Sequence, residues 1–269
     1  MERALALMAG AGVLPGRAAA EAVRQGWRVV AFPFEDAPAL DEHCEAVIPS
    51  QIENIQAVLE ALTARRVSAA VFVGKFWKDR VFAQKRAGAD EAAERLGIGG
   101  LSDGALGEMV VATLGALGVE VLDQRRFLSR FMATGGALSA RGATDAERTE
   151  ILEGLNLART LARHGIGQTV VRSLGVTVAV EAIEGTDETI RRGTRLAGPG
   201  AVVVKAVAPA QDYRFDMPTV GPTTIEAMAE GGATALGIED GKLLLVDHEK
   251  IIRLADAAGI ALVSIDEHG

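Results

Sequence analysis

Short apolar runs alternate with helical patterns through the first half of the chain. The runs cover residues 5–8, 28–32, 46–48, 69–73 and 119–122. Runs of this length are typical of strands buried on both faces of a parallel sheet. Between them, apolar residues recur every three or four positions, as over residues 52–62 and from an N-cap at Ser102 to Gly118. This alternation predicts a doubly wound, parallel, Rossmann-like sheet.

The pattern changes after residue 133. Residues 134–145 are polar and are expected to form a linker, and Thr144 with Glu147 forms the capping box of a long helix. The β runs that follow are residues 169–172 with 176–181, residues 234–238 with 242–246, and single runs at 201–207 and 260–264. Each of the two pairs surrounds a turn and predicts a hairpin. This half is therefore expected to be mixed α/β, with parallel and antiparallel strands.

The length and the change of pattern together predict a two-domain α/β protein. The 269 residues are enough for two ordinary domains. We expect a Rossmann-like N-terminal domain over residues 1–133, a linker over 134–145 and a mixed α/β catalytic domain over 146–269. A cleft is expected between the two domains.

Composition excludes several classes of function. The net charge is −8 and aromatic residues make up 4% of the chain, which disfavours a nucleic-acid partner. Cys44 is the single cysteine, so an intrachain disulfide is excluded, as expected for a reducing cytoplasm. No run of 18 apolar residues occurs, so no transmembrane span is predicted.

A glycine loop follows the first predicted strand. Gly10, Ala11 and Gly12 form a turn that either presents backbone N–H groups to a phosphate or simply joins strand to helix tightly. The dinucleotide fingerprint requires a third glycine where Pro15 stands, which disfavours NAD. The sequence leaves the two roles of the loop open.

Four carboxylates lie within eight residues where a predicted strand ends. They are Glu181, Glu184, Asp187 and Glu188. Carboxylates in such a position commonly bind a hard divalent cation such as Mg²⁺. Alternatively, Thr186 and Asp187 cap the helix that follows, because acidic groups favour its positive end.

Further polar residues stand out in the second half. Lys205 interrupts an apolar strand, where it either meets an anion or lies solvated at a sheet edge. Gln211, Arg214 and Asp216 lie in a turn-rich loop, and Gln168 begins a predicted strand. A basic group, two acidic clusters and a glycine loop suit Mg²⁺-assisted chemistry on a phosphate anhydride.

Several motifs occur in the order of a known family. They are residues 9–15 (AGAGVLP), 166–168 (IGQ), 180–187 (VEAIEGTD), 204–205 (VK), 211–212 (QD) and 214–221 (RFDMPTVG). With them the chain resembles the LpxI-type UDP-2,3-diacylglucosamine pyrophosphatases of lipid A biosynthesis. The resemblance implies a two-domain α/β enzyme with its substrate between the domains. It further implies Mg²⁺-dependent hydrolysis, with Mn²⁺ as an alternative, of UDP-2,3-diacylglucosamine to UMP and 2,3-diacylglucosamine 1-phosphate (lipid X). Water is expected to attack the phosphorus nearer the sugar.

The resemblance and the residue patterns together give a set of predicted site residues. The essential aspartate of the family motif falls on Asp216. The predicted catalytic residues are Asp216, Asp187 and Lys205. The predicted metal ligands are Glu181, Glu184, Asp187 and Asp216. The predicted substrate-binding residues are Ala11, Gly12, Gly74, Lys75, Gln168, Glu181, Gly185, Thr186, Gln211, Arg214 and Thr219.

Two alternatives remain open at the level of sequence. One is a pyrophosphatase for another UDP-sugar, which an apolar cleft for two acyl chains would distinguish. The other is a non-catalytic module that binds a nucleotide sugar. A diacylated substrate and the lack of a predicted span place the protein in the cytoplasm, with peripheral contact at the inner face of the cytoplasmic membrane. A homo-oligomer is left open.

Overall fold

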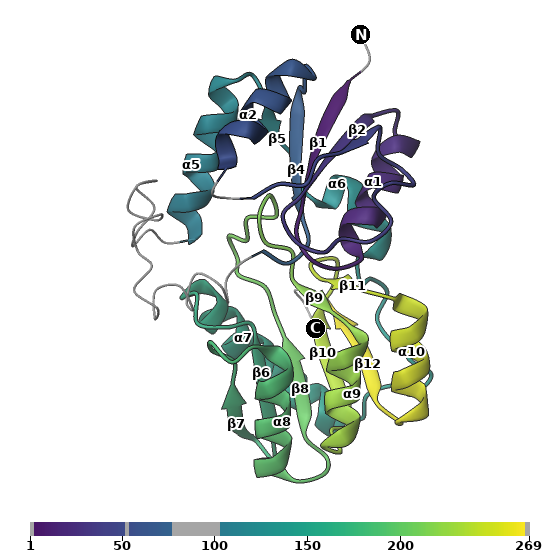
Figure 1. The fold of residues 1–269 in the computed structure, drawn as a ribbon. Coiled ribbons are helices and arrows are strands. Elements are labelled where there is room, and N and C mark those ends of the chain that lie inside the picture. Colours follow the sequence, from purple (N-terminus) through teal and green to yellow (C-terminus); the bar gives the residue numbers. More distant parts are fainter. Residues whose placement is uncertain (1–2, 52–53, 77–102, 267–269) are drawn as a thin grey trace. The chain divides into compact units, whose positions relative to one another are not determined.

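A computed structural model describes residues 3–51, 54–76 and 103–266, which form two compact units (Figure 1). The N-terminal unit comprises Met1–Ser129 and Tyr213–Phe215, and the C-terminal unit comprises Arg130–Asp212 and Asp216–Gly269. The first boundary therefore falls after residue 129 rather than after 133. The three residues Tyr213–Phe215, from the second half of the chain, cluster with the N-terminal unit.

The N-terminal unit contains one parallel sheet, as the apolar runs predicted. Its order is β3 (Ala46–Val47), β2 (Arg28–Pro33), β1 (Ala4–Ala9), β4 (Ala69–Val73) and β5 (Glu120–Val121). Every residue of β1 is buried, because helices cover both faces of the sheet. The doubly wound parallel arrangement is confirmed.

The helices of this unit lie in two layers. They are α1 (Leu14–Arg24), α2 (Ile55–Ala64), α5 (Asp103–Ala116), α6 (Arg125–Leu128) and a 3₁₀ turn (Ser129–Phe131). In Figure 1, α1 and α6 cover one face of the sheet and α2 and α5 the other. Gly118 follows α5 at a φ of 73°, as its predicted role as helix stop requires. The predicted N-cap Ser102 and the predicted helix start at residue 52 lie outside the described residues.

The C-terminal unit contains a mixed five-stranded sheet. Its order is β12 (Ala261–Ile265), β10 (Ala235–Glu239), β8 (Val202–Lys205), β6 (Thr169–Ser173) and β7 (Val176–Val180). The strands β12, β10 and β8 are parallel, whereas β6 is antiparallel to both β8 and β7. Leu174 and Gly175 have φ values of 52° and 77° and form the β6–β7 turn, which confirms the first predicted hairpin.

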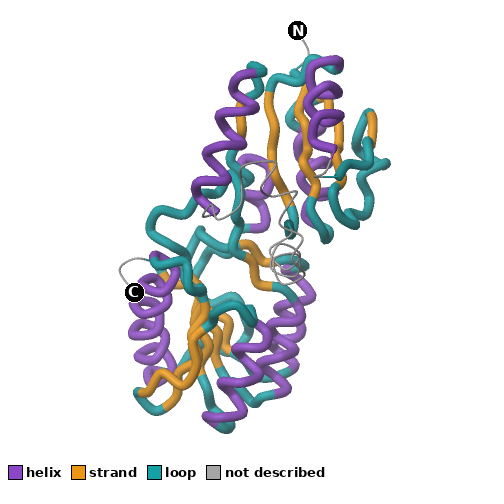
Figure 2. Tube along the Cα trace, turned by 60° about the vertical axis from the view of Figure 1, so that its left-hand side comes forward, coloured by secondary structure: helices purple, strands orange, loops and turns teal. Residues whose placement is uncertain are grey.

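Helices pack on both faces of this second sheet. They are α7 (Asp145–Arg163), α8 (Thr186–Ala197), α9 (Pro222–Glu230) and α10 (His248–Ala257). Helix α7 contacts β8, β6 and β10, while α8 contacts β6 and β7 and packs beside α9. Figure 2 shows these helices as purple coils flanking the orange strands of the unit. The carboxyl ends of β8 and β10 therefore lie at one edge of a sheet covered on both faces.

The second predicted hairpin is wrong. Strand β10 pairs in parallel with β8 and β12, so its neighbours come from distant parts of the chain. Residues Leu244–Leu245 form β11, which pairs in parallel with β9 (Thr219–Val220) in a separate two-stranded sheet. The turn itself is real, since Gly241 has a φ of 64°. The strand pairing is different because burial of β10 on both faces favours a central parallel position.

The segment predicted as a linker is part of the C-terminal unit. Ala137 forms a β-bridge with Val263, and the Leu138 N–H donates to the Leu262 carbonyl at 2.9 Å. The segment therefore extends the β12 edge of the sheet, where its backbone groups gain partners that a free linker would lack.

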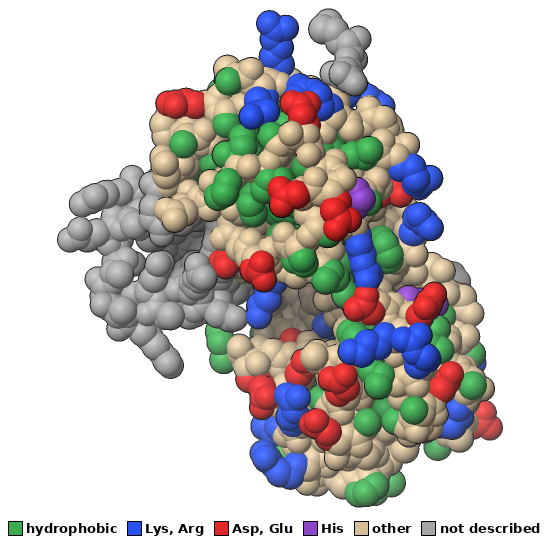
Figure 3. Space-filling model, turned by 45° about the vertical axis from the view of Figure 1, so that its right-hand side comes forward, with side chains coloured by type: hydrophobic (Ala, Val, Ile, Leu, Met, Phe, Trp, Pro, Cys, Tyr) green, Lys and Arg blue, Asp and Glu red, His purple; other side chains and the backbone are tan. Residues whose placement is uncertain are grey.

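In the view of Figure 3, basic and acidic side chains are interspersed over both units. Among the helices within residues 3–51, 54–76 and 103–266, none has the length and apolar character needed to cross a membrane.

The capping box at the start of α7 forms as predicted. The Thr144 hydroxyl accepts from the Glu147 N–H at 3.2 Å, and the Glu147 carboxylate accepts from the Thr144 N–H at 2.8 Å. The Arg141 guanidinium also pairs with Glu147 at 2.8 Å. Burial alone would raise the pKa of the Glu147 carboxyl, but these donors outweigh burial and lower it to about 2.

We predict that Glu147→Gln lowers the free energy of unfolding at pH 7 by about 1.5–3 kcal/mol, the usual range for hydrogen bonds to charged groups. A carboxyl whose folded pKa is depressed stabilises the protein above its unfolded pKa and loses that effect as the pH falls. The difference between wild type and variant should therefore shrink between about pH 4.5 and pH 2. Denaturant unfolding across this range measures it. The control Asp145→Asn, at an exposed site in the same turn, should show a much smaller difference, and equal effects of the two would contradict the prediction.

Candidate functional site

The predicted polar residues of the second half gather at one edge of the C-terminal sheet. Lys205 is the last residue of β8, and Thr169, the first residue of the antiparallel β6, is its register partner. Helix α8 begins beside them, because the Lys205 ammonium contacts Thr186 in its first turn. In open α/β sheets this carboxyl edge is the usual position for ligands.

Lys205 is buried and donates two hydrogen bonds within the protein. Its side chain is 7% exposed, so the predicted alternative of a solvated edge lysine is excluded. The ammonium donates to the Thr186 hydroxyl and to the Thr219 carbonyl, each at 3.0 Å. A buried ammonium requires such acceptors, because the cost of removing it from water is otherwise uncompensated.

Glu181 extends the hydrogen bonds of Lys205. The Thr186 hydroxyl accepts from Lys205 and donates to Glu181 Oε1 at 2.9 Å, while the Gln168 N–H donates to Glu181 Oε2 at 3.2 Å. Gly167 lies directly against the Glu181 backbone, where a Cβ would clash. The absence of a side chain at 167 thus allows Gln168 to reach Glu181.

Asp187 is held by a residue that the sequence reasoning missed. The Thr224 hydroxyl, in the first turn of α9, donates to Asp187 Oδ1 at 3.0 Å. Thr224 is 5% exposed, and this hydrogen bond joins the first turns of α8 and α9. The sequence signal that could have identified it is a hydroxyl residue in the first turn of the helix predicted to start at Gly221 and Pro222.

Asp216 is oriented by its own loop. The Gln211 amide donates to Asp216 Oδ2 and to the Asp216 carbonyl, each at 3.0 Å, and the Asp216 N–H donates to the Asp212 carbonyl at 3.1 Å. Gln211, predicted to bind substrate, therefore positions Asp216 in this structure. The loop closes on itself and presents a single defined carboxylate.

Burial and nearby charges have opposite effects on the pKa of Lys205. Burial lowers the pKa of the Lys205 ammonium, while the charges of Glu181, Asp187 and Asp216 act in the opposite direction. The structure thus brings three of the predicted acidic residues near the predicted lysine. Three carboxylates around one ammonium leave a negative excess, which suits the binding of a cation together with an anionic ligand.

Glu184 has different partners. Its carboxylate accepts from Arg192 at 2.6 Å, from the Thr189 hydroxyl at 3.3 Å and from the Ala182 N–H at 3.2 Å. Its own backbone, and then the Arg192 guanidinium, lower the pKa of the Glu184 carboxyl. Arg192 and Thr189 were not predicted, and they assign Glu184 to the N-terminal turn of α8.

The predicted four-carboxylate ligand set is not assembled in the part of the chain that the structure describes. No group of three or more His, Cys, Asp or Glu side chains there is placed to hold a metal ion together. Protein donors hold both oxygens of Glu181 and of Glu184. Mg²⁺ is commonly held by one or two carboxylates together with substrate phosphates, and Asp187 and Asp216 fit that pattern. Metal binding by these two residues stays a prediction.

The glycine loop of the N-terminal unit forms a tight turn. The N–H groups of Gly10, Ala11 and Gly12 donate to the carbonyls of Val73, Lys75 and Asp36 at 2.8–3.0 Å. A Cβ on Gly74 would lie 2.7 Å from the Gly10 backbone. Of the two roles that the sequence left open, the structure supports the turn, because these three N–H groups already have acceptors. Substrate contacts by Ala11, Gly12, Gly74 and Lys75 through other atoms stay predictions.

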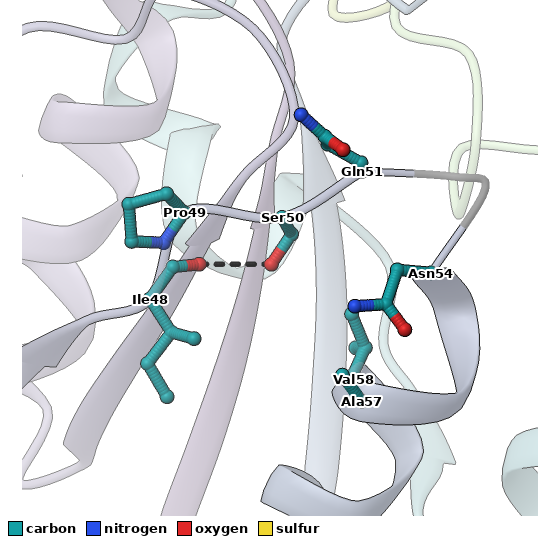
Figure 4. A pocket seen from close by; sticks show the side chains of 7 residues that line it. All are labelled: Ile48, Pro49, Ser50, Gln51, Asn54, Ala57 and Val58. Atoms are coloured by element: carbon teal, nitrogen blue, oxygen red, sulfur yellow. Dashed lines mark hydrogen bonds between the residues drawn. The ribbon is translucent and has the colours of Figure 1, made fainter.

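Two surface hollows lie apart from the predicted residues. The first, in the N-terminal unit, is lined by Ile48, Pro49, Ser50, Gln51, Asn54, Ala57 and Val58 (Figure 4). The Ser50 hydroxyl there donates to the Ile48 carbonyl at 2.8 Å. The second, in the C-terminal unit, is lined by Gly135, Gly136, Arg148, Asp240, Val263, Ser264, Ile265 and Asp266. Neither lining includes a predicted site residue.

The fold and the cluster define a two-unit α/β protein with a buried lysine near several carboxylates at the carboxyl end of a parallel strand. Family models described as the LpxI N-terminal domain and the LpxI C-terminal domain match residues 4–131 and 134–263. The chain therefore belongs to the LpxI family, which confirms the resemblance seen in the motifs. A protein of Caulobacter vibrioides named UDP-2,3-diacylglucosamine pyrophosphatase LpxI is 29% identical over 278 residues, which cover 98% of each chain.

Proposed function

We propose that this protein hydrolyses UDP-2,3-diacylglucosamine to UMP and 2,3-diacylglucosamine 1-phosphate, lipid X, in lipid A biosynthesis. Family membership supports the reaction class, and the name of the Caulobacter relative supports the substrate. The observation that carries the proposal is the buried ammonium of Lys205, which is linked through Thr186 to Glu181 and feels the charges of Asp187 and Asp216. Such a cluster can bind the oxygens of a diphosphate and activate water beside them.

The reaction assigns a role to each group. Asp216 orients a water molecule and takes its proton as that oxygen bonds to the phosphorus nearer the sugar. The bond from this phosphorus to the bridging oxygen breaks, and the bridging oxygen leaves on UMP. The Lys205 ammonium donates a hydrogen bond to a diphosphate oxygen through the N–H that Thr186 and Thr219 do not bind. Thr186 and Glu181 keep the ammonium in place.

Asp187 and Asp216 would hold Mg²⁺, with Mn²⁺ as a substitute. One oxygen of each is fixed by a neutral donor, Asp187 by Thr224 and Asp216 by Gln211, so both carboxylates have a defined orientation. When bound, the cation offsets the negative charge of the diphosphate and of the cluster. Without it, the negative excess around Lys205 would oppose an anionic substrate.

The proposed substrate also implies where the protein works. Two acyl chains hold UDP-2,3-diacylglucosamine at a lipid surface, because burial of each CH₂ contributes about 0.8 kcal/mol. We therefore propose peripheral contact with the membrane during turnover. None of the described helices is long and apolar enough to cross a membrane.

Incubation with UDP-2,3-diacylglucosamine in H₂¹⁸O tests the reaction and its direction. Mass spectrometry should find UMP and lipid X, with the label on lipid X, because water attacks the phosphorus nearer the sugar. A parallel incubation with a UDP-sugar that lacks acyl chains should give little product. Equal turnover of both would favour a general UDP-sugar pyrophosphatase, and binding without turnover would favour a binding module.

Removal of divalent cations should abolish turnover. EDTA is expected to stop hydrolysis, and Mg²⁺ or Mn²⁺ in excess over the chelator is expected to restore it. EDTA already saturated with Mg²⁺ serves as the control for effects of the chelator itself. Full activity in EDTA after extensive dialysis would contradict the metal role of Asp187 and Asp216.

Asp216→Asn should lower kcat by about 10²–10⁴-fold, the usual loss for a missing general base. KM should change little, because the carboxylate acts chiefly in the transition state. The thermal midpoint should stay close to that of the wild type, because the amide keeps the size of the side chain. Glu188→Gln removes an exposed carboxylate next to Asp187 and should leave kcat unchanged. A folded Asp216→Asn protein with near-normal kcat would remove Asp216 from the mechanism.

A further inference from the structure

The three residues before Asp216 are anchored in the N-terminal unit. Tyr213–Phe215 clusters with Met1–Ser129, although the residues on either side, Asp212 and Asp216, belong to the C-terminal unit. The chain therefore enters the N-terminal unit for three residues and leaves again. Neither the catalytic proposal nor the fold itself explains why these three residues cluster with the N-terminal unit.

The Phe215 ring packs against Phe72 and Gly107 of the N-terminal unit. Its ring lies 5.2 Å from that of Phe72 in β4, centroid to centroid, at an interplanar angle of 54°. The ring also lies against Gly107 of α5, where a Cβ would approach Phe215 Cδ2 and Cε2 to 3.0 Å. The lack of a side chain at 107 therefore provides the space in which the ring packs.

Tyr213 and Arg214 make polar contacts with the same unit. The Tyr213 carbonyl accepts from the Gln124 N–H at 3.1 Å, and the Arg125 guanidinium lies 3.9 Å from the centre of the Tyr213 ring. The Arg214 guanidinium donates to Glu108 at 2.8 Å. A hydrogen bond, a cation–π contact, an ion pair and an aromatic contact thus hold three consecutive residues.

The anchored residues form the tip of the loop whose base carries Asp216. The Asp216 N–H donates to the Asp212 carbonyl, and Gln211 binds the Asp216 carboxylate and carbonyl, so both ends of the loop are joined. Asp216 directly follows Phe215, so a displacement of the Phe215 ring is transmitted through one peptide unit. The backbone there has only two soft dihedrals per residue with which to absorb it.

We propose that this anchor positions Asp216 for hydrolysis, which makes Phe215, Arg125 and Gly107 positioning residues. The proposal rests on the function proposed above and extends it to residues of the N-terminal unit. Because a misplacement of about 1 Å can cost on the order of 100-fold in rate, loosening the anchor should affect kcat far more than KM.

Two matched pairs of substitutions in the N-terminal unit test the proposal without altering the loop. Gly107→Val places a side chain in the space that the Phe215 ring occupies. Gly115→Val lies in the same helix, but a Cβ there has no heavy atom within 4 Å. Arg125→Ala removes the contact with Tyr213, whereas Arg126→Ala removes a contact of the same kind with Trp27. Measurements are kcat, KM, the thermal midpoint and the rate of tryptic cleavage after Arg214.

Gly107→Val and Arg125→Ala should lower kcat about 10–100-fold, keep KM within about twofold and speed cleavage after Arg214, while both controls behave as wild type. In an Asp216→Asn background the same substitutions should add little further loss, because the anchor acts through that carboxylate. If Gly107→Val does not fold, Phe215→Ala replaces it, with Phe215→Leu as the variant expected to restore most of kcat.

Two results would overturn the proposal. One is a kcat for the anchor variants within about twofold of their controls. The other is a loss that multiplies fully with that of Asp216→Asn, since independent sites add in free energy. Failure of the proposed function is distinguishable, because the wild type itself would then show no turnover while tryptic cleavage still reports the anchor.

Discussion

Burial of the Lys205 ammonium is the constraint around which the site is organised. An ammonium taken out of water loses several kcal/mol unless hydrogen bonds and opposite charges replace its hydration. In this protein the replacements come from four elements. Thr186 begins α8, Thr219 begins β9, Glu181 follows β7 and Asp216 lies in the loop before β9. These four segments are therefore linked to one charge, and the edge of the sheet becomes a defined polar site.

The same charge explains the chemical character of the site. Lys205 compensates part of the charge of the three carboxylates near it, and the remainder favours a cation. Hydrogen bonds from neutral donors such as Thr224 and Gln211 orient the carboxylates without neutralising them. Glu184 is the exception, because Arg192 already neutralises it, and it supports the helix rather than the cluster. The site thus contains carboxylates with two different tasks within one short stretch of sequence.

Glycines of the N-terminal unit allow close packing of backbone and of an aromatic ring. In the N-terminal unit, Gly10 and Gly74 let two loops pack backbone against backbone, and the resulting hydrogen bonds use the N–H groups that a phosphate would need. In the same unit Gly107 makes room for Phe215, a residue of the loop that ends in Asp216. The chemistry that we propose is therefore concentrated in the C-terminal unit, and the anchor that we propose for the Asp216 loop consists of residues that cluster with the N-terminal unit.

Much of the fold follows from local pattern, because strands buried on both faces and amphipathic helices leave a periodic signature that needs no partner to be read. The parallel first sheet, the capping box at Thr144 and the turn at Leu174–Gly175 were all predicted in this way. The motifs likewise identified the family and drew attention to Lys205, Glu181, Asp187 and Asp216. Tertiary structure alone decided the pairing of β10, the separation of Glu184 from the cluster, and the roles of Thr224 and Gln211. These depend on which residues, distant along the chain, become neighbours once each buried polar group has found its partner, and sequence spacing carries no information about that choice.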